Sequence, residues 1–477
     1  MRGWALIFLL CAPAACTGRP ARPPDVLLIT LDTTRADKLP PHRSGQTATP
    51  TFSWLGSQGA VFANAVAPVP LTLPSHASLI TGMWPSRHGI RDNASSRLPD
   101  ERVTLAEVLR ERGYRTAAFV SSVVLQKDRG LAQGFDLYAD MPLDACGEAL
   151  RRRPGNQTVD AALDWIAGQK GPSVFAWIHL FDAHRPYALD AEFARAWESP
   201  YQATIGFMDE QVGRLMQALD RPGSRDETGV IVAADHGEAF GEHGEEGHGL
   251  FLYETTVRVP LLMRGPGIEP REIPDVVRLV DVMPTVLDLV GAASPVLDGV
   301  SLTPLLSGRP LDAALDGYSE SLYPERFGWS RLRALRSERY KLISAPRPEL
   351  YDLQEDPMEL HNRHAERSAL PSAIDVQFAR FDGGSPDQPP PGLRRSAEAL
   401  RAKVEELRYT SSVPSRSSPS PDPATVRGLA ALGYVGPGRP FPRPAGARPD
   451  PKDFVSHFNE LSRPRPISDR CRPSPAR

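Results

Sequence analysis

The sequence predicts an α/β fold with a central, mostly parallel sheet and a small antiparallel α+β subdomain at its C-terminal end. Three observations lead to this prediction. Continuous apolar runs mark buried strands, amphipathic helical segments alternate with them, and short strands with little helix between them begin near residue 301. The chain has 477 residues, which is enough for one large domain and a smaller one.

The first element is the strand Val26–Leu31, an apolar, β-branched run that ends at Asp32. Further buried strands are predicted over Arg115–Val120, Ser173–Leu180, Gly229–Ala234 and Val259–Met263. The helical segments between and after them are Val103–Arg112, Val159–Ala167, Ala203–Leu219 and Val282–Val290. This alternation is typical of a sheet covered by helices on both faces, with ligands bound beyond the carboxyl ends of the strands.

The C-terminal part of the chain has a different pattern. Short strands are predicted over Leu332–Leu335, Tyr340–Ile343 and Leu350–Leu353, followed by a helix over Ser396–Leu407. From Ser411 onward Pro, Ser, Arg and Gly dominate, which predicts a largely disordered tail. The expected organisation is a signal peptide over 1–16, a main domain over 25–310, a small subdomain over 311–410 and the tail over 411–477.

The N-terminus has the pattern of an export signal. A positive charge at Arg2 precedes the apolar run Trp4–Leu10 and small residues up to Cys16. Pro13-Ala14-Ala15-Cys16 resembles a bacterial lipoprotein cleavage box, although proline stands where an aliphatic residue is usual. We therefore expect an exported protein that is either periplasmic or attached to the membrane through a lipid on Cys16.

The composition excludes several other classes of protein. With 55 basic and 58 acidic residues the formal net charge is −3, and no basic patch with interleaved aromatic residues indicates nucleic-acid binding. Of the four cysteines, Cys11 belongs to the signal, and Cys146 and Cys471 can pair in an oxidising compartment. None of them has metal-ligand spacing, and a cysteine nucleophile is not expected either.

Side chains suited to metal binding follow three of the predicted strands. Asp32 follows the first strand, His179 and His184 lie at and beyond the end of the third, and Asp235-His236 follows the fourth. Because the carboxyl ends of parallel strands meet at one edge of a sheet, these residues are expected to converge. Asp32, Asp235 and His236 form the predicted site for a divalent metal ion, with Ca, Mg, Mn and Zn not distinguished. Asp32 as a simple helix cap is the structural alternative.

A proline-rich stretch supplies a candidate nucleophile. Pro68–Gly82 reads PVPLTLPSHASLITG, in which Ser75 is expected to cap a short helix over Ala77–Thr81 that Gly82 ends. Thr72 then lies near the N-terminal end of this helix, where backbone N–H groups favour an anion. A metal lowers the pKa of a bound hydroxyl, so Thr72 is a candidate nucleophile and a further metal ligand. An ordinary proline-rich turn before a surface helix is the alternative.

A segment rich in His, acidic residues and Gly follows the fourth strand. It spans Asp235–Glu254 and reads DHGEAFGEHGEEGHGLFLYE, with few apolar anchors. We interpret it as a loop over the site, in which His248 is the candidate ligand for the substrate or for a second metal.

Eight ordered motifs between Asp25 and Asn362 resemble the sulfatase branch of the alkaline phosphatase superfamily. They are VLLITLDTTRAD at 26–37, PLTLPSHASLITG at 70–82, HLFDAHRPY at 179–187, ADHGE at 234–238, GHGLFLYETTVRVPLL at 247–262, VDVMPTVLDLVG at 280–291, LDGVSLTPLL at 297–306 and ELYDLQEDPMELHN at 349–362. The resemblance implies an alkaline-phosphatase-like α/β sandwich with a four-stranded C-terminal domain. It also implies cleavage of sulfate or phosphate esters through a covalent intermediate on a metal-bound nucleophile.

The resemblance assigns roles to individual residues. Its metal ligands fall on Asp32, Asp235 and His236, and its nucleophile falls on Thr72. Catalytic positions that hold the leaving oxyanion or a second metal fall on His184 and His248. Expected substrate contacts are His179 and His76, the latter standing where the family has an arginine.

The departures from the family pattern concern the nucleophile. Sulfatases carry Cys or Ser where Thr72 stands and oxidise it to formylglycine, which threonine cannot form. The Gly-Lys-Trp-His segment expected after the strand Arg115–Val120 is absent, and Thr33 replaces a second aspartate. Threonine nucleophiles resemble those of phosphodiesterase and phosphoethanolamine- or glycerolphosphate-transferring relatives.

The predicted function is a metal-dependent hydrolase of the sulfatase family that cleaves sulfate or phosphate esters through Thr72. The expected substrate is a small anionic ester or a sulfated or phosphorylated glycan or lipid. Two alternatives stay open. One is a phosphoryl-type transferase of the same superfamily, and the other is a non-catalytic lipoprotein of the same fold that binds an anionic glycan or a protein.

Overall fold

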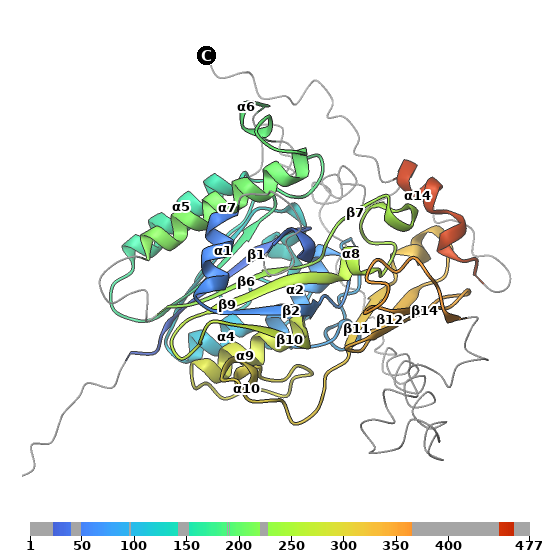
Figure 1. Cartoon of the computed structure of the whole chain (residues 1–477). Helices are drawn as coiled ribbons and strands as arrows, with labels where there is room; N and C mark the ends of the chain where they lie inside the picture. Colours follow the sequence, from blue (N-terminus) through green and yellow to red (C-terminus); the bar gives the residue numbers. More distant parts are fainter. Residues whose placement is uncertain are drawn as a thin grey trace, which may run out of the picture.

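The chain is organised around one eight-stranded sheet. The structure is a computed structural model that describes residues 22–39, 49–94, 97–141, 152–187, 189, 191–219, 228–364 and 448–461. The strand order of the sheet is β10-β2-β9-β6-β1-β5-β3-β4. Figure 1 shows helices on both faces of this sheet and a smaller sheet beside it. The predicted fold class is confirmed.

Parallel strands form the middle of the large sheet and one of its sides. They are β6 (Thr228–Ala234), β1 (Asp25–Leu31), β5 (Val174–Leu180), β3 (Arg115–Val120) and β4 (Leu137–Ala139). On the other side, β9 (Arg258–Arg264) is antiparallel to both of its neighbours, β6 and β2 (Ala60–Val66), and β10 (Arg271–Arg278) runs parallel to β2. All five predicted buried strands are present.

Helices pack on the two faces of the sheet (Figure 1). One face carries α1 (Pro50–Ser57), α5 (Gly155–Gly168) and α7 (Pro200–Ala218). The other carries α2 (Thr72–Thr81), α4 (Leu105–Glu111), α9 (Val282–Leu289) and α10 (Thr303–Leu306). Shorter helices are α3 (Pro85–His88), α6 (Ala191–Ala194) and α8 (Glu254–Val257).

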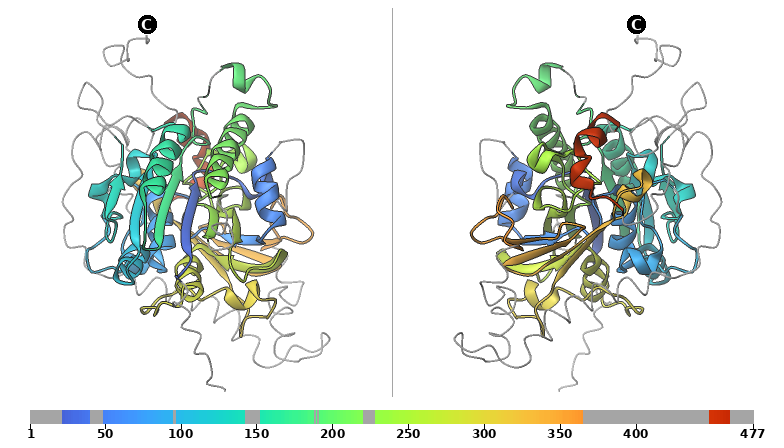
Figure 2. Two further views of the ribbon diagram at one scale, coloured as in Figure 1. Left: turned by 90° about the vertical axis from the view of Figure 1, so that its left-hand side faces the viewer. Right: turned by 90° about the vertical axis from the view of Figure 1, so that its right-hand side faces the viewer.

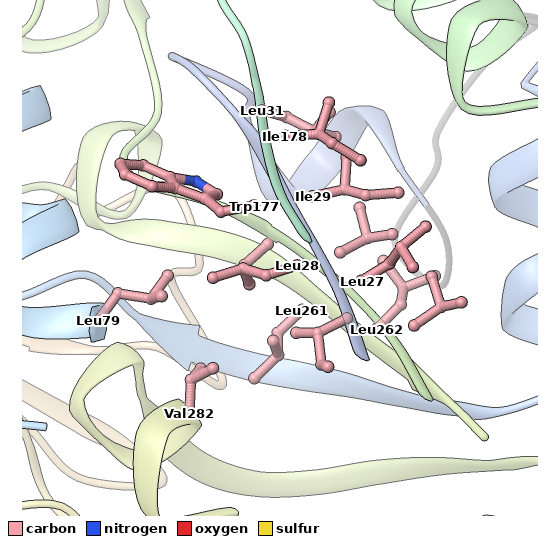
Figure 3. Packing of buried hydrophobic residues seen from close by; sticks show 14 of the residues in the cluster. Leu27, Leu28, Ile29, Leu31, Leu79, Trp177, Ile178, Leu261, Leu262 and Val282 are labelled. Carbon is pink, nitrogen blue, oxygen red and sulfur yellow. The ribbon is translucent and has the colours of Figure 1, made fainter. Parts of the chain in front are cut away.

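The alternation of side chains along β1 explains the two-sided core. Leu27 and Ile29 point to one face of the sheet, whereas Leu28 points to the other, together with Trp177 (Figure 3). All four side chains are fully buried. Burying an aliphatic side chain of this size contributes about 1.5–3 kcal/mol, so a continuous apolar run is stable here only because helices cover both faces.

The C-terminal subdomain is built on an antiparallel sheet in the order β11-β12-β13-β14. Its strands are β11 (Gly317–Ser321), β12 (Leu332–Arg336), β13 (Tyr340–Ser344) and β14 (Glu349–Asp352). The four-stranded C-terminal sheet implied by the family resemblance is therefore present, and β11 adds a strand that the sequence pattern did not predict.

Part of the predicted disordered tail is folded, which corrects that prediction for residues 448–461. A 3-10 turn over Pro451–Asp453 and the helix α14 (Val455–Leu461) pack against the subdomain, and Phe458 is buried. Figure 2 shows this segment in red on the side of the molecule where the antiparallel sheet lies. The residues of the predicted signal peptide, the predicted helix Ser396–Leu407 and the four cysteines lie outside the described residues.

In the described part of the chain, none of the helices combines the length and the apolar character that a membrane span needs.

Candidate active site

Three neighbouring strands end at the same edge of the sheet and bring the predicted metal-type residues together. β1 lies between β5 and β6, and Thr30 of β1 pairs with His179 of β5. Asp32 and Asp235 directly follow the last residues of β1 and β6. Residues from distant segments thus meet beyond the carboxyl ends of parallel strands, as the sequence predicts.

Helix α2 brings Thr72 to this edge. The helix begins at Thr72 rather than at Ala77, and Ser75 lies inside it instead of capping it, which corrects the prediction. The Ser75 hydroxyl donates a hydrogen bond to the main-chain oxygen of Asp235 (2.7 Å), so it ties the helix to the end of β6. The helix ends as predicted at Gly82, whose φ of 62° is left-handed.

Asp32, Asp235 and His236 form a buried cluster whose ligand atoms all lie within 4.8 Å of one another. Thr72 Oγ1 lies 3.3 Å from Asp32 Oδ2 and 3.4 Å from His236 Nε2. Asp32 Oδ1 and Asp235 Oδ2 are buried and have no hydrogen-bond partner among the described residues. A buried carboxylate oxygen is costly unless a donor or a cation neutralises it. Two carboxylates, an imidazole and a hydroxyl therefore fit a divalent cation.

The pKa values of the cluster agree with this interpretation. Burial raises the pKa of Asp32 to about 8, although the charge of His248 and the hydrogen bond from Thr72 lower it in part. Burial and the neighbouring Asp32 raise the pKa of Asp235 well above its usual range. Burial lowers the pKa of His236, which keeps its imidazole in the neutral form that binds metals. A cation between the carboxylates would favour their ionised forms.

Main-chain contacts orient the predicted ligands. His236 Nδ1 donates to the Gly237 oxygen (3.0 Å), which leaves Nε2 to face Thr72 and Asp32. Asp235 Oδ1 accepts from the backbone N–H groups of His236 (2.9 Å) and Thr33 (3.2 Å), which leaves Oδ2 for a cation. Thr33 holds a positive φ of 50°, an unfavourable conformation that aims its N–H at Asp235.

His179 supports Asp32 from the neighbouring strand. The Ser121 N–H donates to His179 Nδ1 (3.3 Å), so that Nε2 carries the proton and donates to Asp32 Oδ2 (3.1 Å). Burial lowers the pKa of His179 to about 3, which keeps the ring neutral. Both ring nitrogens are engaged within the protein, and a substrate contact by His179 stays a prediction.

His76 supports the start of α2. Its Nδ1 donates to the Thr72 oxygen one turn earlier in the helix (2.8 Å), and its Nε2 accepts from Thr30 Oγ1 (3.0 Å). Burial lowers the pKa of His76 well below its usual value. The neutral ring therefore links the backbone of Thr72 to β1, and its predicted contact with substrate likewise stays a prediction.

His184 and His248 lie beside the cluster. The His248 ring centre is 4.4 Å from that of His236 and 5.1 Å from that of His184. His184 Nδ1 donates to the Arg185 oxygen (2.8 Å), and burial lowers its pKa to about 3. His248 Nδ1 donates to Glu238 Oε1 (3.2 Å). The structure thus brings together every residue that the sequence singled out for catalysis.

Glu238 is a site residue that sequence reasoning missed. Its side chain is fully buried, and although burial raises its pKa, the charges of His248, His184 and Arg185 together lower it below the usual value. An ionised carboxylate therefore orients His248. Its place in the motif ADHGE was a usable signal, whereas the contact of Ser75 with Asp235 required the tertiary structure.

Comparison with known families decides the classification. The family model described as Sulfatase matches residues 24–292. The chain belongs to the sulfatase family. A second model, described as N-sulphoglucosamine sulphohydrolase, C-terminal, matches residues 241–377. The protein is therefore an ester hydrolase by family.

Curated relatives extend over most of the chain. Human arylsulfatase A is 29% identical over 72% of this chain and 83% of its own length. The choline-sulfatase of Rhizobium meliloti (strain 1021) is 26% identical over 75% of this chain and 87% of its own length.

Solved structures share the sulfatase fold. A 2-O GAG sulfatase superposes with a TM-score of 0.62 at 21% identity, covering 88% of this chain and 99% of its own. Phosphonate monoester hydrolase of Agrobacterium radiobacter gives a TM-score of 0.62 at 22% identity, covering 81% and 96%.

Proposed function

We propose that this sulfatase-family protein hydrolyses a sulfate or phosphate ester through a covalent intermediate on Thr72. In this proposal Asp32, Asp235, His236 and Thr72 hold one divalent cation. The observation that carries the proposal is the position of Thr72 Oγ1, 3.3 Å from a carboxylate oxygen and 3.4 Å from an imidazole nitrogen of the buried cluster. If Thr72 had only a structural role, nothing would explain why two buried carboxylate oxygens of the cluster, Asp32 Oδ1 and Asp235 Oδ2, have no hydrogen-bond partner among the described residues.

The cation would supply a lowered hydroxyl pKa and would neutralise charge on the ester oxygens. Thr72 Oγ1 forms the new bond to sulfur or phosphorus as the bond from that atom to the leaving oxygen breaks. The hydroxyl proton of Thr72 passes first to Asp32 Oδ2, the acceptor 3.3 Å away. Water then attacks the same sulfur or phosphorus and gives a proton to His248, while Asp32 returns its proton to the departing Thr72 oxygen; this releases sulfate or phosphate and restores the hydroxyl.

His248 is the proposed proton donor to the leaving oxygen. Its Nδ1–H donates to the ionised Glu238, which fixes the orientation of the ring for proton transfer. His184 Nδ1 donates to the Arg185 oxygen, and we assign to its ring the binding of an ester oxygen or of a second cation. In this proposal both imidazoles face the substrate.

The substrate class follows from the charge of the site and from the relatives. Curated relatives include an arylsulfatase, a choline-sulfatase and a Delta 4,5-hexuronate-2-O-sulfatase. We propose a small anionic ester or a sulfated or phosphorylated glycan or lipid. Export, with or without a lipid on Cys16, belongs to the same proposal.

A second candidate function is phosphoryl-type transfer to an alcohol. The observation that favours it is Thr72 itself, because threonine cannot become the formylglycine of family sulfatases. A transferase and a hydrolase would share the intermediate on Thr72 and differ only in whether an alcohol or water accepts the group. Adding a primary alcohol to the assay and separating the products distinguishes the two.

Thr72→Ala tests the nucleophile. We expect turnover of an aryl sulfate, aryl phosphate or phosphodiester to fall by roughly 10⁴-fold or more, because a missing nucleophile cannot be replaced by binding alone. Thermal unfolding should stay close to that of the unmodified protein, and turnover is measured at saturating metal because the substitution also removes one of the four proposed ligands. Thr72→Ser is the matched control, since it keeps a hydroxyl at the same place.

Two results would contradict the proposal. Full turnover by Thr72→Ala would remove Thr72 from the mechanism. A metal-loaded protein that turns over no ester of the panel, yet binds a sulfated oligosaccharide, would instead support the non-catalytic binding protein.

A further inference from the structure

A short hairpin joins Glu238 to His248. Its strands are β7 (Ala239–Phe240) and β8 (Glu246–Gly247), with Ala239 paired to Gly247. The next pair outward in this antiparallel register is Glu238 and His248, which are joined by the 3.2 Å hydrogen bond. The register of this hairpin therefore decides whether the carboxylate meets the imidazole.

The hairpin has little to stabilise it internally. Each strand has two residues, and the turn contains left-handed residues at Gly241, His243 and Gly244. Two main-chain hydrogen bonds link the turn, from Gly241 to Glu245 (2.8 Å) and from Gly244 to Gly241 (2.9 Å). A two-stranded hairpin of this kind is marginal without external packing.

Asn459 of α14 supplies one such external contact, in addition to the stacking of His243 on Tyr253 and the ion pair of Glu242 with Arg35. Its Oδ1 accepts from the Glu246 N–H (2.9 Å), and its Nδ2 donates to the Gly244 oxygen (2.7 Å). One side-chain amide thus binds two positions of the C-terminal arm of the hairpin, as a further strand would. It acts 211 residues away in sequence from His248.

The segment that carries Asn459 is firmly attached to the subdomain. Phe458 is buried, and its ring centre lies 5.8 Å from that of Tyr323 and 6.0 Å from that of Phe327. Phe454 stacks on Trp329, with 5.1 Å between the ring centres. Figure 1 shows α14 beside the hairpin and above the antiparallel sheet. The aromatic contacts fix α14, and α14 in turn fixes the hairpin.

Val455 adds a steric contact at the same turn. A Cβ atom on Gly244 would lie 3.1 Å from Val455 Cγ1, whereas a Cβ atom on Gly241 would meet nothing within 4 Å. Both glycines have a positive φ, 85° and 103°. They therefore form a matched pair that separates the contact with α14 from backbone strain.

We propose that Asn459 is a positioning residue of the active site: through the β7–β8 hairpin, it holds His248 against Glu238 and toward the leaving oxygen. This inference rests on the proposed function for its effect on turnover. It assigns to the C-terminal segment 448–461 a part in catalysis, in addition to its packing on the subdomain.

The test compares variants of the full chain loaded with metal. We expect Asn459→Ala to lower kcat by about 10–100-fold with little change in KM, since losing an outer contact to a catalytic group costs that much. Hydrogen exchange at the Glu246 amide should speed up while the midpoint of thermal unfolding stays the same. Asn459→Asp keeps the acceptor and should show a smaller loss.

Two controls separate positioning from folding. Ser456→Ala changes an exposed residue of the same helix and should leave kcat unchanged. Gly244→Ala should lower kcat in the way that Asn459→Ala does, whereas Gly241→Ala, which carries the same kind of backbone strain, should not.

The outcomes are decisive for this inference and separable from the proposed function. Unchanged kcat and unchanged Glu246 exchange in Asn459→Ala would overturn it, even with Thr72→Ala inactive. Equal losses in Gly244→Ala and Gly241→Ala would also overturn it. If Thr72→Ala retains turnover, the proposed function fails, yet faster Glu246 exchange and lower kcat in Asn459→Ala would still support the positioning role.

Discussion

Two buried clusters of charge in this molecule are neutralised in different ways. At the edge of the large sheet, Asp32 and Asp235 have carboxylate oxygens without a hydrogen-bond partner among the described residues. At the contact between α8 and the subdomain, Glu254 pairs with Lys341 (3.1 Å) and with Arg336 (3.3 Å). Lys341 is 1% exposed and also pairs with Glu359 (2.9 Å).

The two clusters shift the pKa of an acid in opposite directions. Burial raises the pKa of Asp32 to about 8. Burial also acts to raise that of Glu254, but the charges of Arg336 and Lys341 bring it down to about 2. The second acid beside Lys341, Glu359, keeps a pKa that burial raises to about 7. The protein thus provides its own cations at the contact with the subdomain, and it leaves carboxylates unpaired where we propose that a cation from solution binds.

The largest expected effect concerns the sheet-edge cluster. Asp235→Asn removes one charge that would hold the cation, so we expect metal content to fall and kcat to drop by at least ~10³-fold, because charge stabilisation by a metal is worth several kcal/mol. When both proteins have been treated with a chelator, however, the midpoint of thermal unfolding of Asp235→Asn should be no lower than that of the unmodified protein. An Asp235→Asn variant that keeps its metal and its activity would contradict the idea that the sheet-edge cluster, unlike the interface cluster, binds a cation from solution.

The interface cluster should respond in the opposite way. Lys341→Met leaves Glu254 and Glu359 buried without their shared cation, which costs about 3–5 kcal/mol when a buried pair is broken. Urea unfolding should report this loss, while metal content stays normal. Lys452→Met is the control, since Lys452 pairs with Glu349 in a more exposed position and should cost about 1 kcal/mol or less.

Per pH unit, the smallest expected effect is on the pH dependence of stability. In metal-free protein the pKa of Asp32 is raised from 3.8 to about 8, so the folded state holds a proton that the unfolded chain releases. Its contribution is complete below pH 3.8 and is lost as the pH rises through about 8. For Glu254, lowered from 4.5 to about 2, the contribution is present above pH 4.5 and is lost as the pH falls toward 2.

Urea unfolding at a series of pH values checks both signs. Each group contributes a slope of up to about 1.4 kcal/mol per pH unit, the value for one proton. Asp32→Asn should remove the decrease in the free energy of unfolding of the metal-free protein between pH 3.8 and about 8. Glu254→Gln should remove part of the decrease that occurs as the pH falls from 4.5 toward 2. A shared sign for both variants would contradict the comparison.

Local pattern was sufficient for the parallel strands β1, β3, β5 and β6 and for the metal-type cluster, but not for β4. β1, β5 and β6 are buried on both faces, so their apolar runs are continuous, and the chemistry-bearing residues follow at once. The edge strand β10 contains Pro274 and four charged residues, which is permitted only because it lacks a neighbour on one side. Its pattern therefore carried no usable signal.

Buried polar segments were also beyond the sequence pattern. β11 reads GYSES and is buried throughout, because Ser319 donates to the Ala67 oxygen (2.7 Å), Ser321 donates to the Gly249 oxygen, and Glu320 pairs with Arg91. These partners lie far away in sequence. The same reason applies to Asn459, because its side-chain amide finds its hydrogen-bond partners on a hairpin that is distant in sequence.

By itself, the sequence determined the fold class, the family pattern and the convergence of Asp32, Asp235 and His236, because the period of apolar residues and the geometry of parallel strands require no distant information. Only the tertiary structure decided that α2 starts at Thr72, that Glu238 orients His248 and that residues 448–461 are folded. Those outcomes depend on hydrogen bonds and packing between segments up to hundreds of residues apart, which no local pattern encodes.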